Sequence, residues 1–236
     1  MLVAVSSSGG GDRQPVLKYD ARAGRIHLMD RVQDNGEWVT HTRDVTMQAP
    51  QFAVDFGSVE TGWMLFPKGA APIMVLAPFG QAEPPQPPAV GTRKLSDGRE
   101  VPNNFQRGFR LKVAGKALAD PTGGVVREFT ANARVVLEGV NELHTAFCAA
   151  PEARAGKIPV VRLREAAPVK AGQSTNYKPI FEIVSWADRD EKLFGARTVA
   201  PPAAGAVQAV PAPAAPVAAA TTPVSVSTAL GDAVPF

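Results

Sequence analysis

Gly108-Phe109-Arg110-Leu111-Lys112-Val113 is the stretch that decides the fold class of this chain. Its apolar side chains alternate one by one with the cations Arg110 and Lys112. Alternation with a period of two places the two sets on opposite faces of an extended strand. The stretch therefore predicts a β-strand with one apolar face directed to a core and one basic face directed to solvent.

Strand-like runs lie on both sides of this stretch and predict a mainly β domain. Two hairpins are expected before it, one turning at 20–24 with Gly24 at a positive φ and one turning at 34–36. Further strands are expected at 52–56, 62–66, 73–76, 158–164 and 179–186. Residues 81–102 carry several prolines followed by cations, which favours a long exposed loop without regular structure.

One α-helix is predicted, from Glu128 to Ala150, because apolar residues recur there at helical spacing and Pro151 then ends the run. Many strands, one late helix and two closing strands are typical of a five-stranded Greek-key barrel of the oligonucleotide-binding (OB) type. A different β-barrel or a β-sandwich fits the same runs nearly as well.

The two ends of the chain differ in composition from this OB-like domain, which we expect to span residues 15–197. Residues 1–14 are rich in Ser and Gly and predict a flexible N-terminus. Residues 198–230 hold no charged side chain and consist mainly of Ala, Pro, Val, Ser and Thr, which predicts a disordered linker. Residues 231–236 follow the linker as a separate tip.

Composition limits the classes of function. The net charge of +3 favours an anionic partner. A single cysteine, Cys148, leaves no intramolecular disulfide and fits a reducing compartment. The first residues lack a basic segment followed by a long apolar one, and no run approaches 18 apolar residues. We therefore expect a cytoplasmic protein that makes no use of a membrane.

Patterns typical of enzymes are weak, so we expect a binding protein, not an enzyme, with no catalytic residue, cofactor or metal. His27 and His41 are scattered, and Cys148 lies four residues after His144 with no further Cys or His to complete a zinc site. The acids of residues 188–191 alternate with cations and fit a charged turn better than a magnesium site. No Gly-x-Ser-x-Gly occurs.

The segment from Arg93 to Lys116 carries seven Lys or Arg residues and two acids, with Phe105 and Phe109 among them. Phosphates require positive charge, and unpaired bases require flat faces on which to stack. This mixture indicates a site for single-stranded nucleic acid, although a solvated basic face has the same composition. Phe105 is the candidate stacking residue, since Phe109 shares the apolar face of its strand. The candidate phosphate-binding residues are Arg107, Arg110 and Lys112.

A second candidate surface follows in the strand that ends at Trp186. Tyr177, Lys178 and Trp186 lie near the ends of this strand, where aromatic rings can reach a groove. A buried position in the core explains Trp186 equally well.

The tip reads Gly231-Asp232-Ala233-Val234-Pro235-Phe236. It resembles the C-terminal peptide of bacterial and phage single-stranded DNA-binding proteins, which ends in acids followed by Ile-Pro-Phe or a close variant. The resemblance covers these six residues, with one acid where several are usual. It implies that Asp232, Val234, Pro235 and Phe236 recruit replication and recombination proteins while the domain binds single-stranded DNA.

The domain does not look like the ordinary bacterial family, which favours a phage or prophage origin. The alternative hypothesis is a β-rich phage structural or scaffold interaction protein that binds no nucleic acid. A homo-oligomer is compatible with both hypotheses.

Deleting Asp232–Phe236 tests the tip. Binding of single strands should be unchanged or slightly tighter, since a terminal acid no longer competes for the basic site. Capture of replication and recombination proteins should be lost, and Phe236→Ala alone should cause most of that loss, because the Phe is the tip's large apolar contact. The measurement is a pull-down from host lysate with full-length and truncated protein. The same retained proteins in both lanes would contradict the prediction.

Overall fold

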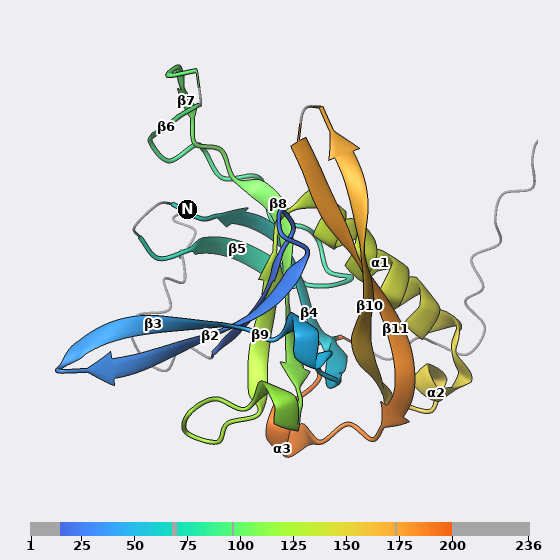
Figure 1. Ribbon diagram of the computed structural model, residues 1–236. Coiled ribbons are helices and arrows are strands. Elements are labelled where there is room, and N and C mark those ends of the chain that lie inside the picture. The colour runs from blue at the N-terminus through green and yellow to red at the C-terminus, as the bar shows by residue number, and fades with distance from the viewer. Residues whose placement is uncertain (1–14, 68–69, 96, 173, 200–236) are drawn as a thin grey trace, which may run out of the picture. The chain divides into compact units, whose positions relative to one another are not determined.

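The computed structural model describes residues 15–67, 70–95, 97–172 and 174–199 (Figure 1). These residues form a mainly β fold, a curled half-barrel sheet with few helices, as the alternating pattern predicted. The predicted flexible N-terminus, most of the linker at 198–230 and the tip at 231–236 lie outside the described residues.

The chain begins with two hairpins formed by β1 (Val16–Asp20), β2 (Arg25–Asp34) and β3 (Glu37–Asp44). Gly24 has a φ of 68° in the first turn, a left-handed conformation that glycine adopts without steric cost. The second turn consists of Asn35 and Gly36, both at positive φ, as two-residue hairpin loops require. Both predicted hairpins are confirmed. A 3-10 helix, η1 (Thr46–Gln48), follows them.

Two predicted strands at 52–56 and 62–66 form one long strand, β4 (Phe52–Leu65). Its pairing with β8 (Gln106–Ala114) shifts register between Asp55 and Glu60, so the strand bends without ending. The bend is held by Asp55, which is fully buried, accepts a hydrogen bond from the Gly57 amide and pairs with Arg189 at 2.9 Å. The sequence gives no local sign of that partner, which lies far along the chain.

The segment between β4 and β8 holds three shorter strands. β5 (Ile73–Pro78) confirms the strand predicted at 73–76 and extends it by two residues, and it pairs with the second half of β4. β6 (Thr92–Lys94) and β7 (Glu100–Pro102) form a small hairpin of their own. The prediction of a loop without regular structure at 81–102 was therefore wrong for these two strands, whose residues follow the prolines.

The predicted helix at Glu128–Ala150 begins too early. Residues Val126–Ala131 form strand β9, and α1 runs from Arg134 to Ala149. In β9 the buried residues Arg127, Phe129 and Ala131 alternate with partly buried ones, and the strand has ladder partners on both sides. Pairing along two edges outweighs the local helical spacing. Pro151 does end α1 and starts the short helix α2 (Pro151–Arg154).

The two closing strands are longer than predicted. β10 (Ile158–Ala171) and β11 (Ser174–Ala187) form a hairpin of fourteen-residue strands, and α3 (Glu191–Phe194) follows. A second 3-10 helix, η2 (Lys116–Leu118), connects β8 to β9. In Figure 1 the β10–β11 turn lies at the top of the view, together with the β6–β7 hairpin.

Nine strands form one sheet in the order β11-β10-β4-β8-β9-β1-β2-β3, with β5 on the second half of β4. Among the described residues, the strand pairings in this sheet are antiparallel except that of β1 with β9. The sheet curls until the β1–β2 turn meets β11, where the Tyr177 amide donates a hydrogen bond to the Ala21 carbonyl at 2.6 Å. The N-terminal hairpin thus bridges the gap between β9 and β11.

Helix α1 packs on β11 through a close backbone contact at Gly139. A Cβ atom at this position would lie 2.3 Å from the carbonyl oxygen of Pro179. Glycine inside a helix lowers stability relative to alanine, and the close packing of the helix backbone against Pro179 explains why it is found here. The helix directs Val136, Val140 and Phe147 into a core that also holds Phe109, and this core fills the curl of the sheet. Among the described residues, no helix is long and apolar enough to cross a membrane.

Gly139→Ala should destabilise the fold, because the added methyl group overpacks the contact with Pro179 at a cost of up to about 3 kcal/mol. The gain in helix propensity, about 1 kcal/mol, offsets part of that cost and leaves a net loss of up to about 2 kcal/mol. The measurement is the midpoint of chemical unfolding, with Thr145→Ala on the exposed side of the same helix as control. A variant at least as stable as the unmodified protein would show that α1 does not depend on this approach.

Candidate nucleic-acid interface

The basic face of β8 is occupied by contacts within the chain. Arg110 forms ion pairs with Glu60 at 2.6 Å and with Glu128 at 3.7 Å, both from neighbouring strands. Lys112 donates a hydrogen bond from Nζ to the carbonyl oxygen of Phe194 in the segment after β11. A phosphate would have to compete with these partners, so Arg110 and Lys112 offer less free positive charge than their sequence indicates.

The pKa of Glu128 on this face is set by opposing influences from burial and from the neighbouring charges. Burial raises the pKa of the Glu128 carboxyl above its ordinary value, and the positive charge of Arg110 acts in the opposite direction. Glu60 lies close enough to raise the same pKa further. Arg110 therefore offsets the repulsion between two carboxylates on the strands that flank β8.

Arg107, the third predicted phosphate ligand, holds an aromatic ring in place. Its guanidinium lies 5.4 Å from the centre of the Trp63 ring, a cation–π distance, and 2.7 Å from a Glu83 oxygen. The Trp63 indole nitrogen donates a hydrogen bond to the Pro84 carbonyl at 2.9 Å. The ring is half-buried, with Arg107 over its face and its indole nitrogen bound to the Pro84 carbonyl. The sequence offered no signal that set Trp63 apart from the other tryptophans.

The predicted stacking residue Phe105 is only 4 % exposed, as is Phe109. A base could stack on Phe105 only after the chain around it opened. Trp186 is half-buried, packs against the core and lies 6.1 Å from the Phe147 ring, between centroids. The structure thus places these three rings against the interior of the domain.

Tyr177 and Lys178 lie on the β10–β11 hairpin, near the point where it meets the β1–β2 turn. Tyr177 is half-buried, and its Cβ atom would be 3.2 Å from a Cβ added at Gly24. Lys178 forms an ion pair with Glu142 of α1 at 2.8 Å. These residues are on the outer strand but are tied to their neighbours, and they do not share a surface with Arg110.

Exposed cations that form no ion pair within the described part of the chain include three on the β6–β7 and β10–β11 hairpins. Arg93 of β6 and Arg164 and Lys170 of β10 are exposed, and none of the three pairs with another residue in the described part of the chain. Figure 1 draws both hairpin tips at the top of the view, with the first residues of β8 between them in that view. Arg164 and Lys170 were not singled out from the sequence, where a long hairpin was not predicted.

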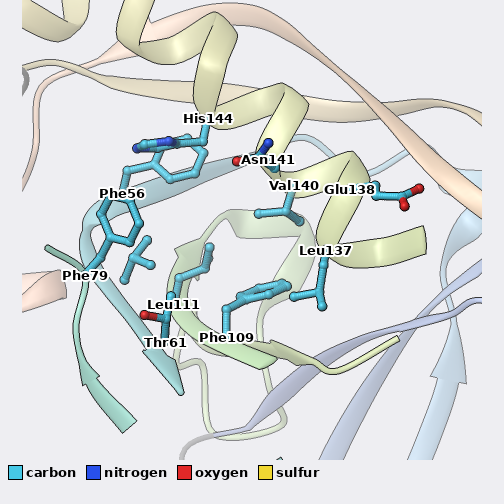
Figure 2. Close-up of a pocket in the computed structure, with 11 residues that line it drawn as sticks. Phe56, Thr61, Phe79, Phe109, Leu111, Leu137, Glu138, Val140, Asn141 and His144 are labelled. Atoms are coloured by element: carbon cyan, nitrogen blue, oxygen red, sulfur yellow. The ribbon is translucent and has the colours of Figure 1, made fainter. Parts of the chain in front are cut away.

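A cavity of about 370 Å³ lies between α1 and the strands β4 and β8 (Figure 2). Leu111 and Phe109 line it opposite α1, and Phe56 and Phe79 lie on one side beside His144, with their ring centroids 5.0 and 5.3 Å from that of His144. Burial lowers the pKa of His144, so the ring is neutral at pH 7. The polar groups at its border include an acid, Glu138, and no cation, so the cavity suits an apolar group and not a phosphate.

The pair His144 and Cys148 does touch, with Sγ 3.5 Å from Nε2, but burial raises the pKa of the thiol. Within the described ranges no group of three or more His, Cys, Asp or Glu side chains is placed to hold a metal ion.

Comparison with known proteins gives no match, neither to a family model, nor to a curated protein, nor to a solved structure.

Arg110→Ala should destabilise the protein, and the loss should grow as pH rises above about 4.5. Without Arg110 the folded-state pKa of Glu128 rises further above its ordinary value of 4.5, so stability is retained at low pH and lost as Glu128 ionises. Urea unfolding at pH 4.5 and pH 7.5 measures the difference. Arg110→Lys, which keeps the charge, serves as control. A loss equal at both pH values would contradict the assigned role of the ion pairs.

Proposed function

We propose that this protein binds single-stranded DNA without sequence preference through an OB-type barrel. The observation that carries the proposal is the order of five strands around α1. Along the chain these strands are β4, β8, β9, β10 and β11, and α1 lies between the third and the fourth. In the sheet they follow the order β11-β10-β4-β8-β9, so the first strand pairs with both the second and the fourth.

This connectivity is the one expected of an OB barrel, in which a long bent first strand is shared by two halves of the sheet. The register shift in β4 between Asp55 and Glu60 supplies such a bend. An OB barrel closes by parallel pairing of its third and fifth strands. Here β1 pairs in parallel with β9, the third strand, and its turn contacts β11, the fifth. The N-terminal hairpin therefore lies between the third and fifth strands, where an OB barrel would pair these two strands directly.

OB domains bind oligonucleotides on the second and third strands and on the loops that join strands one to two and four to five. In this chain the first of those loops is the segment between β4 and β8, which carries Arg93. The second is the turn of the β10–β11 hairpin, near which Lys170 lies. Exposed cations without a protein partner are thus found on both of the loops that such a site uses.

Aromatic surface lies at the end of β4, the strand from which the first of these loops starts. Phe66 is 45 % exposed, and Trp63 presents a half-buried ring whose orientation Arg107 and Pro84 fix. A base can stack on a ring that is already held in place without a further loss of side-chain freedom. We therefore assign phosphate binding to Arg93, Arg164 and Lys170 and base stacking to Trp63 and Phe66.

Recruitment of replication and recombination proteins by the tip is part of the same proposal and rests on its resemblance alone, since the tip lies outside the described residues. A phage structural or scaffold protein that binds no nucleic acid is the competing hypothesis.

Changing Arg93, Arg164 and Lys170 together to Ala should weaken binding to an oligo-dT strand of about 30 nucleotides and lower its salt dependence. Three lost phosphate contacts reduce the slope of log K against log salt by about 2, at roughly 0.7 per contact for single strands. Trp63→Phe should abolish most of the change in tryptophan fluorescence on binding. Fluorescence titrations at several salt concentrations measure both effects.

The matched control is the triple variant Lys116→Ala, Lys157→Ala and Lys192→Ala, which removes the same charge near η2, α2 and α3 (Figure 1). Its salt slope should equal that of the unmodified protein. Equal losses in the two triple variants would mean that binding follows net charge and has no site. Equal affinity for duplex would contradict the proposed single-strand site, and absence of binding at low salt would favour the competing hypothesis.

A further inference from the structure

The outer edge of β3 ends the nine-stranded sheet, and no strand in the described part of the chain pairs with it. Beyond Asp30 the β2–β3 hairpin projects from the domain, and its residues from Glu37 to Arg43 are exposed wherever their burial is described (Figure 1). The edge contains no proline and its register with β2 is unbroken from His27 to Asp34. Natural sheets usually protect such edges with prolines, bulges or covering segments, because an open row of backbone groups pairs readily with another strand.

The backbone groups that face outward can be identified from the hairpin. A two-residue turn is closed by a hydrogen-bonded pair, here Asp34 and Glu37, and bonded and non-bonded pairs then alternate along the strands. The hydrogen bond from the Val45 amide to the Ile26 carbonyl, at 2.9 Å, agrees with this alternation. Residues 38, 40 and 42 of β3 therefore direct their amide and carbonyl groups away from β2, to the free edge.

Outward-facing residues of one strand must meet outward-facing residues of the other, which restricts the registers that two copies of β3 can adopt. Within β3 two antiparallel registers of seven residues meet this condition, one centred on Thr40 and one on His41. The second would use Asp44, which is half-buried and already bound to Arg25 and Thr46. The favoured register is therefore the one in which Thr40 lies opposite Thr40 of the second copy. It covers residues 37–43 of both strands. In this register Val39 lies opposite His41, and Glu37 lies opposite Arg43, once at each end of the ladder.

The charges of this register are complementary. Glu37 and Arg43 are exposed and form no ion pair with any residue that the structure describes. In an antiparallel pair, opposite charges on directly facing residues stabilise the ladder, and like charges destabilise it. Val39, an apolar residue 40 % exposed on the same face, would be covered by the partner strand. A contact in which residue i meets j and j meets i is the geometry of a two-fold symmetric dimer.

We propose that two copies of this protein dimerise by antiparallel pairing of their β3 edges, centred on Thr40. The sheets of the two copies become continuous through this ladder, and the β2–β3 hairpin is a dimerisation element. Because seven residues per strand form a small interface, the dimer is expected to dissociate on dilution. The inference is independent of the proposed DNA site, which lies on other hairpins.

Sedimentation velocity over a concentration series, without DNA, tests the proposal. The unmodified protein should show a monomer–dimer equilibrium. Glu37→Arg places Arg opposite Arg43 at both ends, and Arg43→Glu places Glu opposite Glu37 at both ends. Each single variant should raise the dissociation constant roughly tenfold or more. Glu191→Arg, an equal charge change on the exposed surface of α3, should leave the dimer intact.

Mixing the two single variants gives the decisive measurement. A Glu37→Arg chain and an Arg43→Glu chain regain opposite charges at both ends of the ladder, so the mixture should form a heterodimer at concentrations where each variant alone is mostly monomeric. The double variant with both changes should dimerise again as well. Misfolding of a single variant cannot produce this recovery. A protein that is monomeric at all concentrations, or a mixture that stays monomeric, would overturn the proposal.

Discussion

The buried guanidinium of Arg127 is the interaction on which the arrangement of this domain depends. The side chain is 0 % exposed, pairs with Asp30 at 2.6 Å and donates a hydrogen bond to the Leu118 carbonyl. Its other donors reach the carbonyl oxygens of Val16 and Met29. A buried charge is tolerated only when its partners are all in place. One residue of β9 therefore holds β1, β2 and η2 at fixed positions.

This constraint explains how an N-terminal hairpin becomes part of the curled sheet. With β1 fixed beside β9, the β1–β2 turn reaches β11, where Ala21 accepts the hydrogen bond from Tyr177. The curled sheet is bridged by a single turn, and α1 supports the same strand from inside through Gly139 and Pro179. Three segments remain outside this framework: the β2–β3 hairpin, the β6–β7 hairpin and the end of the β10–β11 hairpin. The proposed surface for a partner copy lies on the first of these segments, and Arg93 and Lys170 of the proposed DNA site lie on the other two.

The distribution of charge follows from the same geometry. Cations on central strands, such as Arg110, face acids on the neighbouring strands at the close distance that a sheet imposes. Cations on projecting hairpins have fewer neighbours, and Arg93, Arg164 and Lys170 have no partner among the residues described. The most basic stretch of the sequence therefore does not supply the cations most accessible to a phosphate. Whether a cation is accessible depends on which acidic side chains the strand order places next to it.

Local pattern in the sequence was sufficient for the mainly β class, for both N-terminal hairpins with their glycine turns and for the end of α1 at Pro151, since each depends on residues close together in the chain. It misplaced the start of α1, because Val126–Ala131 becomes a strand only when β8 and β1 pair with it. It also could not indicate that Phe105 would be buried, that Arg107 would fix Trp63 or that Arg110 would be neutralised by Glu60. Those outcomes are set by residues that meet across the sheet, whose register only the tertiary structure decides.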